Sequence, residues 1–175
     1  MLQNLFKSRP PERIGLSLYS QAVDQARQPG FYTALGVTDE IDARFELYTL
    51  HVLLLILRLR DEGERGAEIA QDLFDVYVSA LDNALRELGV HDVTMAKKMR
   101  KLGEALYGRM TAYETPIRAA DRPALAEALA RNVYEGADAA VAEGLVDYAL
   151  RARSGLASQS LDEVLARPAW AEVAA

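Results

Sequence analysis

The sequence predicts an all-α protein, a single-domain bundle of six or seven helices around one central buried helix. Apolar residues recur at spacings of three and four in several long segments, which is the period of an amphipathic helix. No segment alternates convincingly between apolar and polar residues, as a half-buried strand does. One stretch, Glu46 to Leu59, is apolar on all sides, so it belongs in the interior of the fold.

The composition is that of one globular domain with an acidic balance. The chain has 175 residues, of which 50% are hydrophobic and 26% are charged. The formal charge of −6 argues against DNA as a partner. The chain has no cysteine, which excludes a disulfide, a thiolate metal site and a cysteine nucleophile. Met1 to Phe6 is too short for the apolar core of a signal peptide, so we expect neither a signal peptide nor a transmembrane helix.

Three segments are expected along the chain. Residues 1–11 read as a flexible arm that ends at two prolines, residues 12–155 as the helical domain, and residues 156–175 as a short helix and a tail. The first helix of the domain spans Glu12 to Arg27, because apolar residues recur there at steps of four. Pro29-Gly30 ends it.

The central helix is expected over about Thr38 to Asp61. Thr38 has the side chain of an N-cap, and the two carboxylates after it suit the positive end of a helix. The uncharged part, Leu47 to Leu57, is far shorter than the roughly 20 residues that cross a bilayer. A buried position in a protein core is therefore the better explanation of its apolar character.

The second half of the chain continues as helices. The segment Ala67 to Leu88 is two-faced, and Gly89 is placed to end it in a left-handed conformation. Thr94 can cap the next helix, which Pro116 is expected to stop. Two further helices are expected over about 121–135, capped by Asp121, and 138–153, and a short one over 160–166 begins with a Ser-Leu-Asp-Glu capping pattern.

The sequence carries no catalytic signature, and we expect neither an enzyme nor a metal or cofactor site. It has no phosphate-binding glycine loop, nucleophile elbow or dinucleotide fingerprint. His51 lies in the most apolar segment of the chain. It is either a neutral core imidazole that is hydrogen-bonded to a carbonyl or carboxylate, or a ligand or proton-sensing group.

Four cations stand close together in this acidic chain: Lys97, Lys98, Arg100 and Lys101, called the basic cluster below. On a helix these four residues occupy the face opposite Met95, Met99, Leu102 and Leu106, and Arg109 lies a little to one side. The cluster is either a solvated face or a surface for phosphate backbone, anionic lipid headgroups or an acidic partner. The methionines either line an exposed groove or belong to the core.

The order of residues in two blocks is similar to that of a known family. The first block runs from Ala26 to Leu59, the second from Phe74 to Tyr113, and Arg131-Asn132 with Tyr134 forms a weaker third. The matching positions are Pro29, Phe31-Tyr32, Gly36-Val37, Asp39, Arg44-Phe45, Leu50-His51, Arg58, Leu85 to Gly89, Lys97-Lys98-Met99 and Tyr107-Gly108-Arg109. This pattern resembles the ubiquinol–cytochrome c chaperone family, whose members assemble the cytochrome bc1 complex. Thr38 stands where the family pattern has proline, and the apolar run lacks a common tryptophan.

The resemblance implies a bacterial, non-enzymatic assembly chaperone that binds newly made cytochrome b or a similar hydrophobic subunit. It also implies a second small assembly factor, and a ribosome or membrane-surface contact through the basic cluster with Arg109. The expected location is the bacterial cytoplasm, or peripheral at the inner membrane. Among the family-pattern residues we expect structural roles for Phe31, Tyr32, Asp39, Arg44, Phe45, His51, Tyr107 and Gly108. The alternative is a helical bundle that binds a small apolar ligand, namely quinone, haem or lipid.

Overall fold

The computed structural model describes residues 11–89 and 92–173, and within them it contains helices and no strand. The predicted all-α class is confirmed. The helices are α1 (Pro11–Ala26), α2 (Gly30–Thr33), α3 (Ile41–Arg60), α4 (Gly63–Glu87), α5 (Asp92–Ala119), α6 (Arg122–Val133), α7 (Glu143–Ser158) and α8 (Leu161–Ala166), with the 3-10 turn η1 (Ala139–Ala142) before α7. The predicted arm lies outside the described residues except for Pro11, which begins α1, so its boundary stays a prediction.

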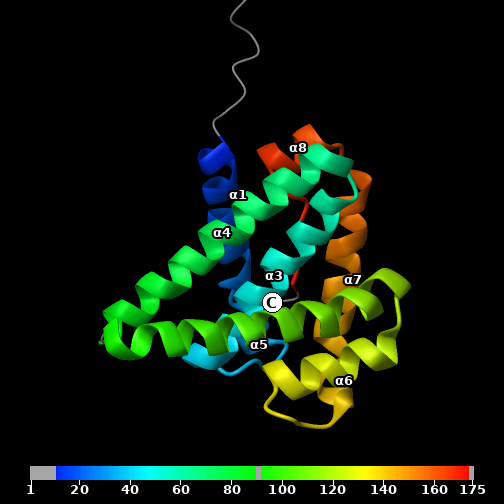
Figure 1. Ribbon diagram of the computed structural model, residues 1–175. Helices are drawn as coiled ribbons and strands as arrows, with labels where there is room; N and C mark the ends of the chain where they lie inside the picture. The colour runs from blue at the N-terminus through cyan, green and yellow to red at the C-terminus, as the bar shows by residue number, and fades with distance from the viewer. Residues whose placement is uncertain (1–10, 90–91, 174–175) are drawn as a thin grey trace, which may run out of the picture.

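Helix α3 is the centre of the bundle, as its apolar sequence predicts. It packs against α1 and α4 on one side and against α5, α6 and α7 on the other (Figure 1). Every residue from Thr49 to Leu59 is buried, including the polar His51 and Arg58. A helix with neighbours all round must be apolar all round. Among the described residues, no helix is both long enough and apolar enough to span a bilayer.

Several helix ends differ from the predicted ones. Helix α3 begins at Ile41 with Glu40 at its N-cap position, so Thr38 is not the cap. Pro116 lies inside α5, which continues to Ala119. A proline so close to the end of a helix removes only one of its last hydrogen bonds, so the helix continues past it. Gly89 does end α4 in the left-handed region, with φ of 81°.

Two caps in the second half of the chain are as predicted. The Asp121 carboxylate accepts a hydrogen bond from the Ala124 N–H at 3.1 Å, which caps α6. Ser160 and Glu163 form a capping box at the start of α8. The predicted helix over 138–153 begins instead as the 3-10 turn η1 and becomes regular only at Glu143.

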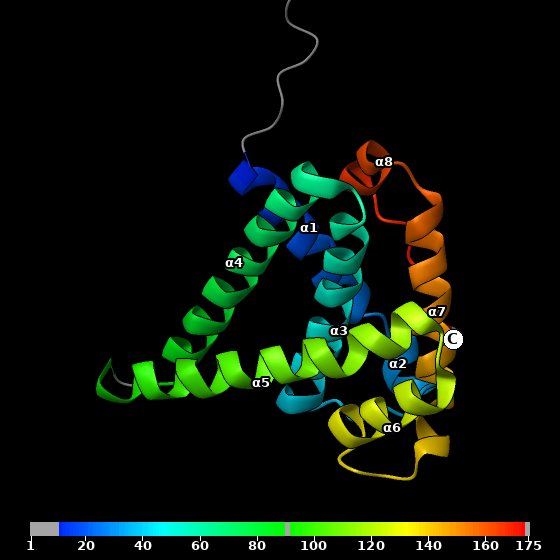
Figure 2. The same ribbon diagram turned by 45° about the vertical axis from the view of Figure 1, so that its right-hand side comes forward.

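Helices α4 and α5 diverge from a common corner instead of packing along their length. In Figure 2 they form two sides of a triangle whose third side is α3. Helix α4 packs mainly on α1 and α3, and α5 packs mainly on α6 and α3. Along α4 the apolar stripe is therefore covered at first and open later: Ile69, Leu73 and Tyr77 are buried, Leu81 is half-buried, and Leu88 is 63% exposed.

Candidate functional site

An apolar groove of about 720 Å³ lies where this stripe is left uncovered. The first turns of α3, the last turns of α4, the middle of α5 and the end of α6 form its walls. We call it the α3–α6 groove. Its large apolar side chains are Ile41, Phe45, Tyr48, Leu81, Leu85, Leu88 and Leu102, and its polar ones include Asp42, Arg44, Glu46, Arg109, Arg131, Asn132 and Glu135.

Large apolar side chains at the groove are exposed to solvent. Ile41 is 67% exposed and Leu88 is 63% exposed. Between them Phe45, Tyr48 and Leu102 are half-buried. Contiguous apolar patches of this kind, with a polar rim, mark surfaces that bind another molecule. The arrangement can therefore take up an apolar segment by burial of surface alone.

A buried ion pair lies at the side of the groove. The guanidinium of Arg109 on α5 donates hydrogen bonds to Oε1 of Glu46 on α3, and it also lies over the Phe45 ring at 5.5 Å. Glu46 is only 3% exposed, and its Oε2 has no hydrogen-bond partner. Burial raises the pKa of Glu46 above its ordinary value, while the hydrogen bond and charge of Arg109 oppose that shift. The unpartnered oxygen is itself buried, so it is a cost to the fold beside the groove and not an acceptor open to a bound molecule.

The basic cluster is exposed on α5, at the end of the groove. All four of its side chains are exposed. The residues of α5 that line the groove begin at Leu102, so the cluster precedes them along the helix and none of its four side chains lines the groove. Arg109 is separate from the cluster, because its guanidinium turns toward Glu46.

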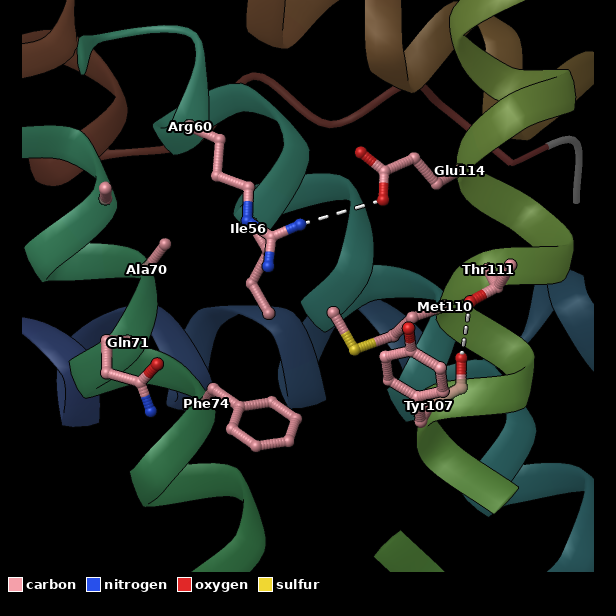
Figure 3. A pocket seen from close by; sticks show the side chains of 10 residues that line it. Ile56, Arg60, Ala70, Gln71, Phe74, Tyr107, Met110, Thr111 and Glu114 are labelled. Carbon is pink, nitrogen blue, oxygen red and sulfur yellow. Dashed lines mark hydrogen bonds and ion pairs between the residues drawn. The ribbon is translucent and has the colours of Figure 1, made fainter. Parts of the chain in front are cut away.

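The methionines of α5 do not line this groove. Met95 is buried and Met99 is half-buried. Met110 lines a second, smaller cavity of about 390 Å³ between α3, α4 and α5, shown in Figure 3. Phe74 and Tyr107 also border it, and an ion pair joins Arg60 to Glu114 across it at 3.6 Å. The three methionines thus belong to the packed side of α5 and to this smaller cavity.

His51 is the centre of a buried network. Its Nδ1 lies 2.7 Å from the Leu47 carbonyl oxygen, and its Nε2 lies 2.7 Å from the Tyr148 hydroxyl. Gln25 donates to the same hydroxyl at 3.2 Å, so the chain of bonds is complete when the imidazole is neutral and protonated on Nδ1. Complete burial lowers the pKa of His51 to about 4. With both nitrogens engaged, the ring has none left for a haem or metal.

The other family-pattern residues divide into buried and exposed groups. Phe31 packs edge-on against His51 and Tyr148, at ring-centroid distances of 5.3 and 4.8 Å. The Tyr32 hydroxyl donates to the Ala26 carbonyl at 3.2 Å. Arg44 and Asp39 form an exposed ion pair. These contacts suit structural roles.

Tyr107 and Gly108 have no comparable contacts. Tyr107 is 76% exposed, and a Cβ added to Gly108 would meet no atom within 4 Å. Packing therefore does not explain either residue, and both stand on the exposed side of α5.

Sequence reasoning missed Ile41, Leu88 and Glu46 as groove residues. Leu88 continues the apolar stripe of the preceding helix, a pattern that predicts burial, and it is exposed because α4 and α5 diverge. Glu46 did carry a signal: it is a carboxylate at the edge of the most apolar segment, where a charge needs a partner. Its partner is 63 positions away, which the sequence alone does not indicate.

The fold and the groove define a class: a small helical domain with an open apolar groove and, among its described residues, no group of three side chains that could hold a metal ion. A sequence model of the family described as ubiquinol-cytochrome C chaperone matches residues 33–171, and the chain belongs to this family.

Solved and curated relatives agree with this assignment. The crystal structure of the Cbp3 homolog from Brucella abortus superposes with a TM-score of 0.84 and is 34% identical, covering 93% of this chain and 91% of the other. The ubiquinol-cytochrome-c reductase complex assembly factor 1 of Xenopus laevis is 26% identical over 67% of this chain and 58% of its own length. The Mus musculus protein of the same name is 23% identical over 86% of this chain and 51% of its own length. The chain thus spans little more than half the length of these curated relatives.

Proposed function

We propose that the chain is a non-enzymatic assembly chaperone for the ubiquinol–cytochrome c reductase complex, and that it holds newly made cytochrome b or a similar hydrophobic subunit. The observation that carries this proposal is the α3–α6 groove, with Ile41 and Leu88 exposed beside half-buried Phe45, Tyr48 and Leu102. Membership of the family and the names of the curated assembly factors support the choice of complex.

The groove fits an apolar helical segment better than a polar peptide. Burying a leucine or isoleucine that was exposed contributes about 1.5–3 kcal/mol, so Ile41 and Leu88 alone supply a substantial driving force. Nothing in this action requires a covalent step: the subunit binds, is shielded from aggregation, and leaves when its own complex covers the same surface.

Capture of the client tests the proposal. The full-length chain is used as bait in extracts of the source cell, alongside an Ile41→Asp/Leu88→Asp variant. Both side chains are more than half exposed, so the variant should fold. Leu16→Asp/Val141→Asp is the matched control, since these residues are 58% and 51% exposed and do not line the groove.

Wild type and control should recover cytochrome b, and the groove variant should recover less than about a tenth as much. If the groove variant recovers as much as the control, another surface holds the client. If no subunit of the complex is recovered with the wild type, the proposed client is wrong. The same experiment also detects a second small assembly factor or ribosomal components.

The alternative, a small apolar ligand such as quinone, haem or lipid, is favoured by one observation. The groove volume of about 720 Å³ is in the range of small-molecule sites. Native mass spectrometry of the purified chain would show a stoichiometric added mass. Haem ligation by Nε2 of the buried His51 would require its hydrogen bond to the Tyr148 hydroxyl to break, and His51 does not line the groove, so a His51→Ala variant should leave any mass bound in the groove in place.

A further inference from the structure

The lysines of this chain are concentrated at one corner. Three of its four lysines lie within five residues, at Lys97, Lys98 and Lys101. Most arginines of the described residues are neutralised by ion pairs, as Arg118 is by Asp61. Within the same residues, no ion pair or hydrogen bond involves a side chain of the basic cluster, although the chain carries a formal charge of −6.

This corner projects from the body of the fold. Figures 1 and 2 show the end of α4 and the start of α5 converging at one side of the molecule, well away from α7. Leu88 lies there, 63% exposed, at the end of α4. Lys98 and Lys101 precede Leu102, the first residue of α5 that lines the groove together with Leu88, so the cations lie beyond one end of the groove.

Helix stability does not account for the cluster. Lys97 and Lys101 are four residues apart, and Lys98 and Lys101 are three apart, so like charges face one another on the helix surface. Glu104 is the one carboxylate among residues 94–106. Like charges held this close together are typical of a surface that binds an anionic partner.

The neighbouring residues favour a lipid surface over a nucleic acid. No aromatic residue occurs between Thr94 and Leu106, and the exposed Tyr107 lies two helical turns beyond Arg100, so no aromatic side chain lies within the cluster itself for a base to stack on. Cations beside an exposed leucine are the combination that binds a bilayer interface: the cations meet anionic headgroups, and the leucine enters the acyl boundary.

We propose that the α4–α5 corner is a membrane-docking surface, in which the basic cluster contacts anionic phospholipid headgroups and Leu88 inserts beside them. This contact would hold the α3–α6 groove open toward the bilayer, where a hydrophobic subunit emerges or inserts. The docking surface shares Leu88 with the groove, but its basic cluster does not line the groove, so the cluster is tested separately from the proposed client.

Vesicle flotation tests the proposal with the full-length chain. The vesicles are phosphatidylcholine alone or phosphatidylcholine with phosphatidylglycerol, at low and at high salt. The charge variant is Lys98→Glu/Lys101→Glu. The matched control is Arg65→Glu/Arg167→Glu, which changes the net charge equally at exposed residues outside the corner. Leu88→Ser is compared with Val141→Ser, because both residues are more than half exposed.

Wild type should float with anionic vesicles and not with neutral ones, and salt should release it. Each cation near an anionic surface contributes about fivefold to partitioning, so Lys98→Glu/Lys101→Glu should bind more than about tenfold more weakly. Arg65→Glu/Arg167→Glu should bind nearly as wild type, and Leu88→Ser more weakly than Val141→Ser.

Two flotation results would overturn the proposal: no flotation of the wild type, or equal weakening by the charge variant and its control. It would also be overturned if the chain bound an RNA fragment but not vesicles, and if Lys98→Glu/Lys101→Glu abolished that RNA binding. Capture of cytochrome b from detergent-solubilised extract should be unchanged in this variant. Failure of the docking surface is therefore distinguishable from failure of the proposed function.

Discussion

Stability of this fold should fall between about pH 7 and pH 5 because of one residue, His51. The imidazole is completely buried and surrounded by Phe31, Tyr148, Trp170 and the Leu47 carbonyl, none of which carries a charge that could offset an imidazolium. Burial lowers its pKa to about 4, whereas an unfolded chain has an ordinary histidine with a pKa near about 6.5. Between these two pKa values the imidazole is protonated in the unfolded state and stays neutral in the folded state.

The direction and the magnitude of the change in stability follow from this difference in pKa between the folded and unfolded states. A lowered histidine pKa contributes stability that is fully present above about pH 6.5 and is lost as the pH falls toward about 4. The whole difference is worth about 3 kcal/mol, and about 2 kcal/mol of it should be lost between about pH 7.5 and about pH 5. Acidic groups with lowered pKa values, such as Asp61, lose their contribution mainly at lower pH.

Urea denaturation at a series of pH values measures the effect. His51→Gln should be less stable than wild type at neutral pH but should lack the steep fall between about pH 7 and pH 5. Tyr148→Phe removes a hydrogen-bond partner and keeps the buried imidazole, so it should retain the fall. Parallel curves for wild type and His51→Gln in this range would refute the assignment, since His91, the other histidine, is common to both.

Three further changes test other parts of the structure by chemical denaturation. Gly66→Ala should destabilise the fold by about 2–3 kcal/mol, because the added Cβ would collide with the Leu59 carbonyl oxygen. Gly108→Ala, where the added Cβ meets open space, should stabilise the helix by about 0.5–1 kcal/mol. Equal effects of the two substitutions would refute the close approach at Gly66. Arg58→Met should cost about 2–4 kcal/mol, since the buried guanidinium donates to two backbone carbonyls at the end of α7, and a loss below about 1 kcal/mol would contradict this. Ser160→Ala should cost about 1 kcal/mol by removing the capping box, with faster amide exchange in α8; unchanged exchange would show that the cap contributes nothing.

The sequence determined the class of the fold and the position of its central helix. A run that is apolar on all sides has no stable place except the interior, so α3 could be located before any neighbour was known. Local signals were also sufficient for the caps at Asp121 and Ser160 and for the left-handed Gly89, because their partners lie within a few residues. The exposure of the basic cluster follows from helical periodicity in the same way.

The tertiary structure alone decided where the groove lies. Periodicity tells which face of a helix is apolar, but not which neighbour covers it or how far along. The stripe of α4 is uniform in sequence, yet it is buried at Leu73 and exposed at Leu88, because α5 crosses away from it. The pairing of Glu46 with Arg109 and of His51 with Tyr148 likewise joins positions far apart in the chain. Such contacts depend on the angles at which the whole set of helices packs, and these are properties of the assembled core rather than of any one segment.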